Sequence, residues 1–335
     1  DEAQISGNTT LCYPDTTTTL NMSSQMNCYS GVRHYYWDFG DGINTGWSTF
    51  PLPQTHAFPD TGTYEVVLID SNICGIDSAV AEVTIYLPPD AEFTADTVCL
   101  GEMTSFTDQS TIPANNGSIT NYTWNFGDGH TSSQQNPKHQ YSGYGSYNVT
   151  LTVESEHGCF DVVQHQVYVK ETPAVSYSTS PGFNICDSNT ISFQGNVTLN
   201  TTTVDSIKWD FGDGSDTNIL NPTHSFTPNG TYPVRFHVIA ANGCAAYDSN
   251  AVNVYSSPSA HFSSDSICFG DQTHFSDQST TQDNENIVSW KWDFNSDGSV
   301  DNTSQNPSHY FPSFGTYNIM LVVTTEYGCI DTIIE

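Results

Sequence analysis

Four short acidic phrases hold the residues of this chain that are best suited to chemistry. They read YYWDFGDG, YTWNFGDG, IKWDFGDG and WKWDFNSDG, and they begin at residues 35, 122, 207 and 290. Two carboxylates can act as general acid and base when they converge on one pocket that separates their pKa values. Asp38 and Asp41 of the first phrase are instead expected on a strand and in the turn after it, where aspartate bonds to turn amides. We therefore predict no catalytic residue and interpret the phrases as turns of a scaffold.

A histidine also recurs at one position of each copy. These histidines are His56, His139, His224 and His309. Histidine is a common general base and metal ligand, but four modules cannot all build one active site. Because partner ligands do not follow nearby, we expect packed, hydrogen-bonded imidazoles. The nine cysteines contain no CxxC pair and the chain has no GxSxG turn, so the sequence indicates neither a cysteine zinc site nor a serine nucleophile.

The fourth phrase differs from the others because it contains the spacing DxNxDGxxD. Its candidate oxygen ligands are Asp293, Asn295, Asp297 and Asp301. This spacing resembles the first part of an EF-hand calcium loop, although Ser304 stands where the bidentate glutamate is expected. Two interpretations stay open: a weak calcium site, with a dissociation constant of about 10⁻⁴–10⁻³ M, or a β-turn that is one residue longer. Calcium in this repeat is the one cofactor that the sequence suggests.

The charge of the chain restricts its partners. Its 335 residues include 37 acidic and 6 basic side chains, for a net charge of -31. Nucleic acid and anionic membrane surfaces carry the same sign, so neither is expected to bind. The chain has no run of 18 apolar residues, which argues against membrane insertion, and DEAQISGNTT lacks the layout of a signal peptide, so we expect any export signal to have been removed. Nine cysteines and several Asn-x-Ser/Thr triplets favour an oxidising, extracellular location.

The acidic phrases belong to a frame that recurs four times and positions them. The tryptophans of the phrases are spaced by 87, 85 and 83 residues, and a Gly-x-Tyr step with alternating apolar residues follows each one. A two-residue period predicts strands with one buried face, and no helical period occurs. We therefore predict an all-β chain of four tandem two-sheet β-sandwiches. Their expected core residues include Trp37, Trp124, Trp209, Trp292, Tyr64, Tyr147, Tyr232 and Tyr317.

The same frame predicts the domain boundaries. Repeat 1 is expected at residues 1–88, repeat 2 at 89–172, repeat 3 at 173–257 and repeat 4 at 258–335. Short linkers marked by proline, such as Pro88-Pro89, favour an elongated rod because proline fixes φ. Repeat 1 is divergent. Half of the last strand expected for repeat 4 is missing. Because an unpaired sheet edge is prone to aggregation, we expect the natural chain to continue.

The combination of WDFGDG, NPxHxY and GxY resembles the PKD domain, an immunoglobulin-like sandwich, and it covers nearly the whole chain. The variant with a cysteine before FTDQS and GC after the tyrosine strand is similar to repeats of large surface proteins and adhesins of gliding, type IX-secreting bacteria. That resemblance implies a glycoprotein with O-glycosylation at Asp-Ser/Thr triplets. The candidate acceptors are Thr16, Ser78, Thr97, Ser206, Ser266 and Thr332.

Two wirings of the cysteines fit the repeat. Pairing within each repeat gives Cys12–Cys74, Cys99–Cys159, Cys186–Cys244 and Cys268–Cys329 and leaves Cys28 alone. In an immunoglobulin-like sandwich, however, the A–B and F–G turns lie at opposite ends, about 30 Å apart, which is too far for a disulfide. This topology favours pairing between consecutive repeats, with Cys268 awaiting a further repeat. The favoured pairs are Cys12–Cys159, Cys99–Cys244, Cys186–Cys329 and, at the end of repeat 1, Cys28–Cys74.

These features lead us to expect a non-enzymatic stalk segment of a large secreted or cell-surface fibre or adhesin. Its expected partners are other repeats of the same longer chain and other surface proteins or like filaments. The alternative is a glycan- or polymer-binding accessory module of an adhesin or secreted hydrolase, with polysaccharide as partner. Trp47 in NTGWSTF lies outside the repeat frame and is the candidate stacking residue for that alternative, unless it simply covers a loop.

Overall fold

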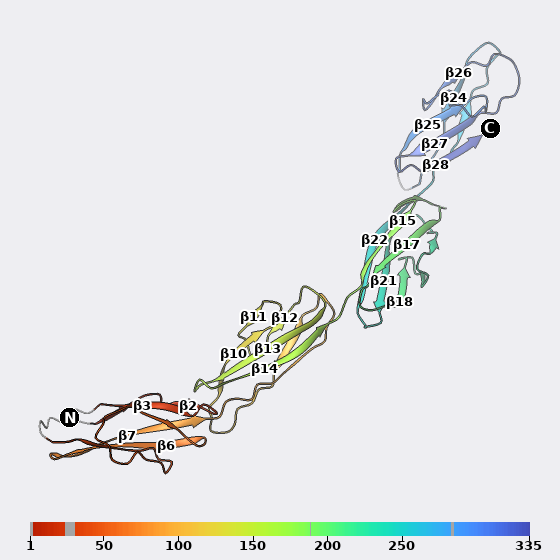
Figure 1. The fold of residues 1–335 in the computed structure, drawn as a ribbon. Coiled ribbons are helices and arrows are strands. Elements are labelled where there is room, and N and C mark those ends of the chain that lie inside the picture. Colours follow the sequence, from red (N-terminus) through yellow and green to blue (C-terminus); the bar gives the residue numbers. More distant parts are fainter. Residues whose placement is uncertain (1–2, 24–30, 188, 283–284) are drawn as a thin grey trace. The chain divides into compact units, whose positions relative to one another are not determined.

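The computed structural model describes residues 3–23, 31–187, 189–282 and 285–335. Over these residues the chain consists of strands and turns without a helix, which confirms the all-β prediction. The chain divides into two compact units, residues 1–170 and 171–335, and each unit holds two β-sandwiches (Figure 1). We call the four sandwiches repeats 1 to 4 in chain order.

Among the described residues there is no helix with the length and apolar character that crossing a membrane requires.

Repeat 1 has two sheets, with strand orders β1-β3-β5 and β2-β7-β6-β4. The long hairpin of β6 and β7 pairs Gly62 with Ile85 at one end and Asn72 with Gly75 at the other. Its alternating residues Val66 and Leu68 are fully buried, as the two-residue period requires. The strands are β1 (Gln4–Ser6), β2 (Thr10–Cys12), β3 (Thr17–Ser23), β4 (His34–Asp38), β5 (Gln54–Ala57), β6 (Gly62–Asn72) and β7 (Gly75–Tyr86).

Repeat 2 repeats this arrangement with the sheets β12-β9-β8 and β11-β10-β13-β14. Its central hairpin pairs β13 with β14 from Gly145 opposite Val169 to Glu154 opposite Phe160. The strands are β8 (Phe93–Ala95), β9 (Thr104–Asp108), β10 (Ile119–Asn125), β11 (Thr131–Ser132), β12 (Lys138–His139), β13 (Gly145–Ser155) and β14 (Phe160–Val169).

Repeat 3 has the sheets β15-β17-β20 and β16-β22-β21-β18-β19. Its central hairpin pairs β21 with β22 from Gly230 opposite Val254 to Ile239 opposite Ala245. The strands are β15 (Ala174–Ser180), β16 (Asn184–Cys186), β17 (Ile191–Thr198), β18 (Val204–Asp210), β19 (Asp216–Thr217), β20 (Thr223–His224), β21 (Gly230–Ala240) and β22 (Ala245–Tyr255).

Repeat 4 has the sheets β23-β24-β26 and β25-β27-β28. Its last strand, β28, has 5 residues, whereas the corresponding strands β7, β14 and β22 have 12, 10 and 11. The strands are β23 (Phe262–Ser264), β24 (Thr273–Asp277), β25 (Ile287–Asp293), β26 (Ser308–His309), β27 (Met320–Thr325) and β28 (Ile330–Ile334).

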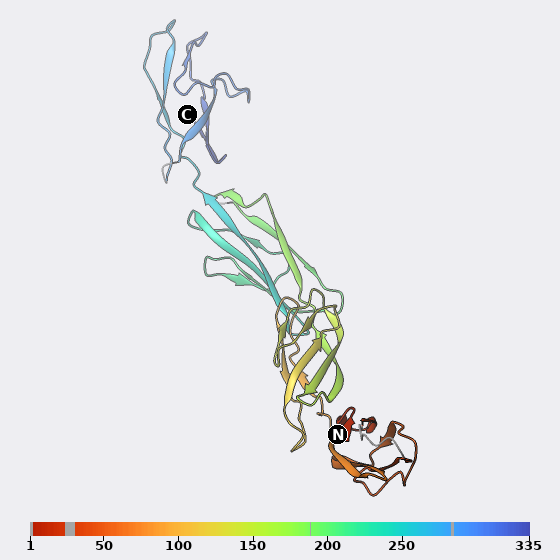
Figure 2. The same cartoon turned by 90° about the vertical axis from the view of Figure 1, so that its left-hand side faces the viewer.

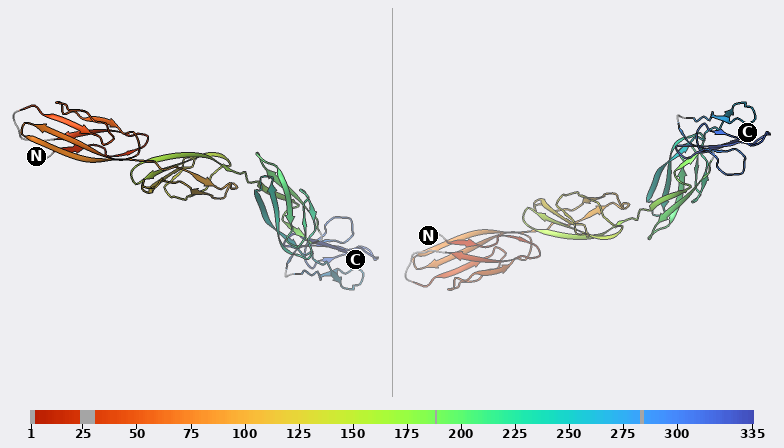
Figure 3. Two further views of the ribbon diagram at one scale, coloured as in Figure 1. Left: turned by 90° about the horizontal axis from the view of Figure 1, so that it is seen from below. Right: turned by 90° about the horizontal axis from the view of Figure 1, so that it is seen from above.

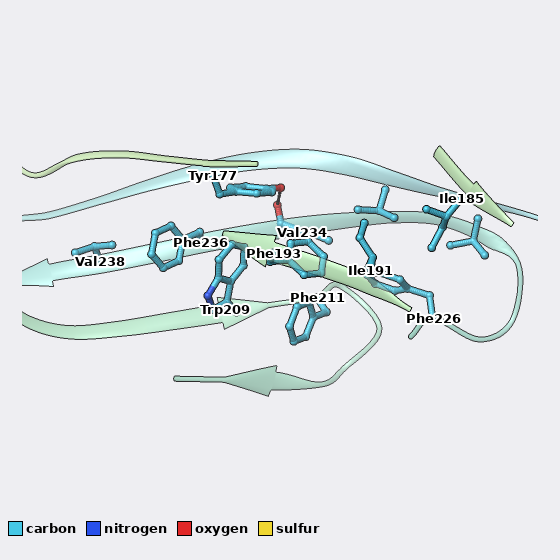
Figure 4. Close-up of a cluster of buried hydrophobic side chains, with 12 residues drawn as sticks. Tyr177, Ile185, Ile191, Phe193, Trp209, Phe211, Phe226, Val234, Phe236 and Val238 are labelled. Carbon is cyan, nitrogen blue, oxygen red and sulfur yellow. Dashed lines mark hydrogen bonds between the residues drawn. The ribbon is translucent and has the colours of Figure 1, made fainter. Parts of the chain in front are cut away.

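The recurring tryptophan is the centre of each core. Trp37, Trp124, Trp209 and Trp292 are at most 2% exposed, and the four Gly-x-Tyr tyrosines pack, partly buried, against the same clusters. In repeat 3, Trp209 lies among Phe236, Phe193 and Tyr177, with ring centroids 4.4, 5.1 and 5.0 Å away (Figure 4). Each repeat therefore closes its own aromatic core, which makes it an independent folding unit.

A short parallel strand places the first cysteine of a repeat at the end where the chain leaves it. β2 pairs in parallel with β7 and sets Cys12 opposite Tyr86, the last residue of β7. β16 pairs in the same way with β22 and sets Cys186 opposite Tyr255. Figures 2 and 3 show from further sides that the strands run along the length of each repeat. Each of these cysteines therefore lies beside the linker to the next repeat.

Candidate functional sites: the acidic turns and the repeat joints

Each acidic phrase of repeats 1 to 3 folds into a turn whose backbone amides donate hydrogen bonds to the aspartate or asparagine side chains of the same phrase. In repeat 1 the Oδ1 of Asp38 accepts the amide of Gly40 at 3.0 Å, and the Oδ1 of Asp41 accepts the amide of Ile43 at 2.9 Å. Gly40 has a φ of +79°, and a Cβ there would meet the Glu65 carbonyl oxygen at 2.6 Å, so only glycine fits. The corresponding amide bonds in repeats 2 and 3 are those to Asn125, Asp128, Asp210 and Asp213.

The recurring histidine completes this turn. The Nε2 atom of His56 lies 2.7 Å from the Oδ2 of Asp41, and its ring stacks on Phe39 with centroids 4.0 Å apart. Burial raises the pKa of Asp41, but the hydrogen bonds from His56 and from the Ile43 amide outweigh burial and hold the pKa below its usual value. The same Asp–His distance of 2.7 Å recurs in repeats 2 and 3, for Asp128–His139 and Asp213–His224. These pairs fasten the turn to a neighbouring strand, which is the structural role expected for the phrase.

The longer turn of repeat 4 is also closed by its own amides. Asp293 is 1% exposed, and its oxygens accept the amides of Asn295, Asp297 and Gly298 at 3.1, 3.4 and 2.9 Å. The Oδ2 atom of Asp301 accepts the amide of Phe294 at 2.8 Å. The four candidate ligands supply oxygens of the kind that calcium prefers, but hydrogen bonds hold the oxygens of Asp293 on the main chain. Both interpretations of the loop, the longer β-turn and the calcium site, stay open.

Calcium binding by this loop therefore stays a prediction, with a test that separates the two interpretations. If the loop binds calcium, a tenfold excess over the dissociation constant stabilises repeat 4 by about 1.4 kcal/mol. The variant Asp297→Ala then loses this gain, which differential scanning calorimetry in millimolar CaCl2 measures. If the loop is only a turn, calcium shifts the native chain and the variant equally.

The joint between repeats 1 and 2 is covalent. Cys12, beside the end of β7, forms a disulfide with Cys159 in the turn between β13 and β14, with Cα atoms 5.4 Å apart. Next to the bond, the ring of Tyr86 stacks on His157 with centroids 3.7 Å apart and an interplanar angle of 10°. The amide of Leu87 in the linker donates to the Oδ1 of Asn116 in repeat 2 at 2.7 Å. A disulfide, a stacked pair and a linker hydrogen bond thus hold the two sandwiches together.

The joint between repeats 3 and 4 shares the disulfide and the stacked pair, but its linker bonds to the preceding repeat. Cys186 forms a disulfide with Cys329 in the turn between β27 and β28, with Cα atoms 5.6 Å apart. The ring of Tyr255 stacks on Tyr327 with centroids 3.9 Å apart and an interplanar angle of 9°. The linker residue Ser257 donates its amide to the Oδ1 of Asp187 at 2.9 Å.

These two bonds decide between the two cysteine wirings. Both are pairs of the inter-repeat scheme, so the intra-repeat scheme, which needs Cys12–Cys74, Cys99–Cys159, Cys186–Cys244 and Cys268–Cys329, is wrong. Pairing within a repeat is prevented by the topology, as expected, because the two cysteines of a repeat lie at opposite ends of the sandwich. Cys74, Cys99 and Cys244 also form disulfides, whereas Cys268 is exposed and free. Cys28 lies outside the described residues, so the pair Cys28–Cys74 stays a prediction. The pair Cys99–Cys244 also stays a prediction.

Glu171, the first residue of unit 2, fastens the start of repeat 3 to two of its turns. Its carboxylate accepts the amide and side chain of Asn200 at 2.8 and 2.9 Å and the amide and hydroxyl of Thr201, both at 2.6 Å. Its carbonyl oxygen accepts the side-chain amide of Asn242 at 2.8 Å. The hydrogen bond from the Thr201 hydroxyl is the largest cause that lowers the pKa of Glu171 from 4.5 to about 2. Sequence reasoning missed this residue because nothing in the segment Glu-Thr-Pro indicates which turns the carboxylate of Glu171 contacts.

The low pKa of Glu171 predicts a loss of stability in acid. Because the folded pKa lies below the unfolded value of 4.5, the carboxylate stabilises repeat 3 fully above about pH 4.5 and progressively less as the pH falls toward 2. We expect Glu171→Gln to destabilise repeat 3 at pH 7 and to match the native chain near pH 2. Denaturant unfolding at a series of pH values measures this difference. The exposed control Glu82→Gln should change repeat 3 at neither pH, and an equal deficit of Glu171→Gln at all pH values would contradict the prediction.

The candidate O-glycosylation sites differ in their accessibility. Thr16 is 9% exposed, and its hydroxyl donates to the carbonyl oxygen of Phe58 at 2.7 Å. A transferase cannot reach that hydroxyl in the folded repeat, so Thr16 is withdrawn as an acceptor. Glycosylation of the five exposed candidates remains a prediction. They are Ser78, Thr97, Ser206, Ser266 and Thr332.

Several recurring contacts were missed from the sequence. The hydroxyl of each Gly-x-Tyr tyrosine bonds to a carbonyl oxygen four residues earlier, as Tyr147 does to Gly143 at 2.8 Å. The same contact joins Tyr64 to Asp60, Tyr232 to Pro228 and Tyr317 to Ser313. The available signal was the constant spacing of this tyrosine. A polar group four residues before a strand tyrosine is the arrangement of the tyrosine corner of immunoglobulin-like sandwiches.

Known proteins resemble individual repeats of this chain. Collagenase ColA of Bacillus cereus is 46% identical over 63 residues, which are 19% of this chain and 7% of the collagenase. Pre-pro-metalloprotease PrtV of Vibrio cholerae is 42% identical over 65 residues, which are 19% of this chain and 7% of PrtV. A microbial collagenase of Vibrio alginolyticus is 40% identical over 83 residues, or 24% of this chain and 10% of the collagenase. The matched segments span a tenth or less of these relatives.

One solved structure is similar to a single repeat of this chain in sequence. The PKD1 domain of the Vibrio cholerae metalloprotease PrtV is 34% identical, with a TM-score of 0.23, and the match covers 25% of this chain and 98% of that domain. The sequence profile of the PKD domain matches the chain four times, at residues 2–87, 86–170, 171–254 and 255–334. The chain therefore belongs to the PKD domain family and consists of four PKD domains in tandem.

Proposed function

We propose that these PKD domains form a non-catalytic stalk segment of a large secreted or surface-anchored protein and hold a functional module away from the cell. The observation that carries the proposal is the pair of disulfides that join one repeat to the next, Cys12–Cys159 and Cys186–Cys329. Disulfides are typical of an oxidising compartment outside the cell. A cross-link at a joint is of use when the joint must resist bending, protease or tension.

The disulfides shorten the covalent path along the chain. Between Cys12 and Cys329, the shortest path runs through both bonds and through the 27 residues that follow Cys159 and end at Cys186. Most of these residues form β14, the linker and β15. Tension applied to Cys12 and Cys329 is therefore carried by the three strands β14, β15 and β16 and the segments between them, while the rest of repeats 2 and 3 is bypassed. This division of load supports a mechanical role.

The surface of the chain supports the same role. The net charge of -31 makes neighbouring copies repel one another, which favours separate stalks over aggregates. The exposed glycosylation candidates would add a hydrated layer. The cysteine-bearing variant of the repeat resembles the repeats of surface proteins and adhesins of gliding, type IX-secreting bacteria. We therefore propose that the chain comes from such a bacterium. Cys268 occupies the position from which Cys12 and Cys186 reach the next repeat, and we expect it to pair with a further repeat in a longer chain.

A replacement experiment tests the stalk function. A binding module is displayed on cells through this chain, and residues 171–335 are either deleted or exchanged for an unrelated pair of immunoglobulin-like domains. A stalk requires length, so deletion should reduce capture of large particles while the exchange restores it. A segment that binds a ligand through its own side chains would lose function in both variants.

The alternative function, binding of a surface polymer, rests on Trp47. Its side chain is 57% exposed and packs against the ring of Tyr36 with centroids 5.4 Å apart. The indole thus has one aromatic neighbour and keeps more than half of its surface accessible to a sugar ring. Phe50 and Leu52, nearby in the sequence, are also exposed, by 69% and 61%.

We expect Trp47→Ala to abolish any retention of the chain on immobilised polysaccharide, which affinity electrophoresis measures. The matched control is Tyr247→Ala in repeat 3, an aromatic residue that is 66% exposed. Retention that survives Trp47→Ala, or that is lost equally in both variants, would remove Trp47 from this role. A native chain without retention favours the stalk.

A further inference from the structure

We propose that repeat 2 binds a zinc-class divalent cation through Asp128, His130 and His139. One ligand atom from each side chain lies within 4.8 Å of the other two. The Oδ2 of Asp128 is 2.7 Å from the Nε2 of His139, and its Oδ1 is 3.2 Å from the Nδ1 of His130. A carboxylate between two imidazoles therefore forms one side of a coordination sphere.

This ligand set suits zinc. Two imidazole nitrogens and one carboxylate oxygen are among the three-ligand sets that zinc binds, with water in the fourth tetrahedral position. Bonds of 2.0–2.1 Å place neighbouring ligand atoms about 3.4 Å apart. The Asp128 and His139 atoms, now 2.7 Å apart, must therefore separate slightly, and ligand atoms that lie up to 4.8 Å apart must approach one another. Nitrogen ligands also select zinc, copper or nickel over calcium and magnesium, which prefer oxygen. The ion would take the place of the proton between the His139 Nε2 and the Asp128 Oδ2, and that proton would leave to solvent.

Two of the three ligands are already fixed. The ring of His139 stacks on Phe126 with centroids 4.2 Å apart and meets the edge of Tyr141 at 4.6 Å. The Oδ1 of Asp128 accepts the amide of His130 at 3.1 Å, which holds the carboxylate in the turn. The side chain of His130 is 73% exposed and can rotate onto the ion. Little conformational freedom is lost on binding, because only one side chain has to move.

The other repeats show that the third ligand is special to repeat 2. Repeats 1 and 3 contain the same aspartate–histidine pair, but Ile43 and Ser215 stand where repeat 2 has His130. Isoleucine offers no ligand atom, and the Ser215 hydroxyl donates to the Oδ1 of Asp213 at 2.6 Å. The aspartate–histidine pair is shared, whereas repeat 2 alone of these three repeats adds an imidazole, whose Nδ1 lies 3.2 Å from the Oδ1 of Asp128. The chain thus contains its own controls for a metal site.

Zinc titration of the whole chain by calorimetry tests the proposal, with excess calcium present to occupy scattered carboxylates. We expect one zinc ion per chain above the background, and a loss of affinity of about tenfold or more in His130→Ser, since even outer-shell changes cost 10–100-fold. The variant His165→Ser removes another exposed histidine of repeat 2, which pairs with Glu92 at 2.6 Å, and should leave the affinity unchanged. The variant Ser215→His should create a second site in repeat 3.

Equal zinc affinity in the native chain and His130→Ser would overturn the proposal. So would an equal loss in His165→Ser, because it would show that zinc binds scattered histidines. A Ser215→His variant that gains no second ion would show that the shared pair and one added imidazole do not suffice. His130 and Ser215 both lie in a surface turn, so these substitutions are expected to leave the fold intact, which circular dichroism checks.

Discussion

Replacement of Trp209 by alanine is expected to lower the free energy of unfolding of repeat 3 by about 3–5 kcal/mol. The indole is fully buried, packs against four aromatic rings and donates its Nε1 hydrogen to the carbonyl oxygen of Leu220 at 3.3 Å. Alanine leaves a cavity that the surrounding rings can fill only in part, and it leaves that carbonyl oxygen without its donor. A domain of this size has a stability of about 5–15 kcal/mol, so a large share is lost.

Hydrogen exchange followed by mass spectrometry measures this loss repeat by repeat. Exchange should accelerate throughout β18, β21 and β22, while repeats 1, 2 and 4 keep their protection because each has its own core. The matched control is Trp47→Ala, which removes the same side chain from an exposed site and should change stability by no more than about 0.5 kcal/mol. Equal effects of the two substitutions would show that the recurring tryptophan does not hold the core.

Loss of the Cys186–Cys329 bond is expected to cost about 2–5 kcal/mol in unit 2. The bond closes a loop with a sequence separation of 143 residues, and removing it frees the unfolded chain to adopt many more conformations. The double variant Cys186→Ala, Cys329→Ala avoids a leftover thiol that could form a wrong pair. The stack of Tyr255 on Tyr327 remains in the variant, so the two repeats should stay in contact but open more often.

Denaturant unfolding and limited proteolysis at the linker near Ser257 measure this effect. Cys268→Ala is the matched control, because it removes a cysteine of the same unit that is free and exposed. This control should behave like the native chain in both assays. A double variant as stable and as protease-resistant as the control would mean that the joint does not depend on its cross-link.

The fold and the disulfides of the joints could be predicted because their signals are periodic. Trp37 and its three counterparts recur at nearly constant spacing, and a two-residue alternation determines which face is buried. The pairing of Cys12 with Cys159 follows from those strands once the topology of the sandwich is known, since opposite ends of a strand cannot share a disulfide.

Contacts between distant single residues could not be predicted in this way. The stack of Tyr86 on His157 joins residues that no local period relates, and it appears only when the two repeats are placed together. Thr16 matched a short glycosylation pattern, but the pattern carries no information on burial. His130 follows Gly-Asp-Gly at the position that Ile43 and Ser215 occupy in other repeats. Only the folded turn shows that His130 and His139 both lie beside the carboxylate of Asp128.

Single-molecule stretching between the two ends of the chain tests the stalk proposal most directly. With both inter-repeat disulfides closed, the segment from Cys12 to Cys329 should extend to at most about 100 Å, at about 3.5 Å for each of the 27 residues in the load path. After reduction the same segment should unfold repeat by repeat to roughly 1,100 Å. An oxidised chain that releases the longer length under force would contradict the account, because its joints would not carry the load through their disulfides.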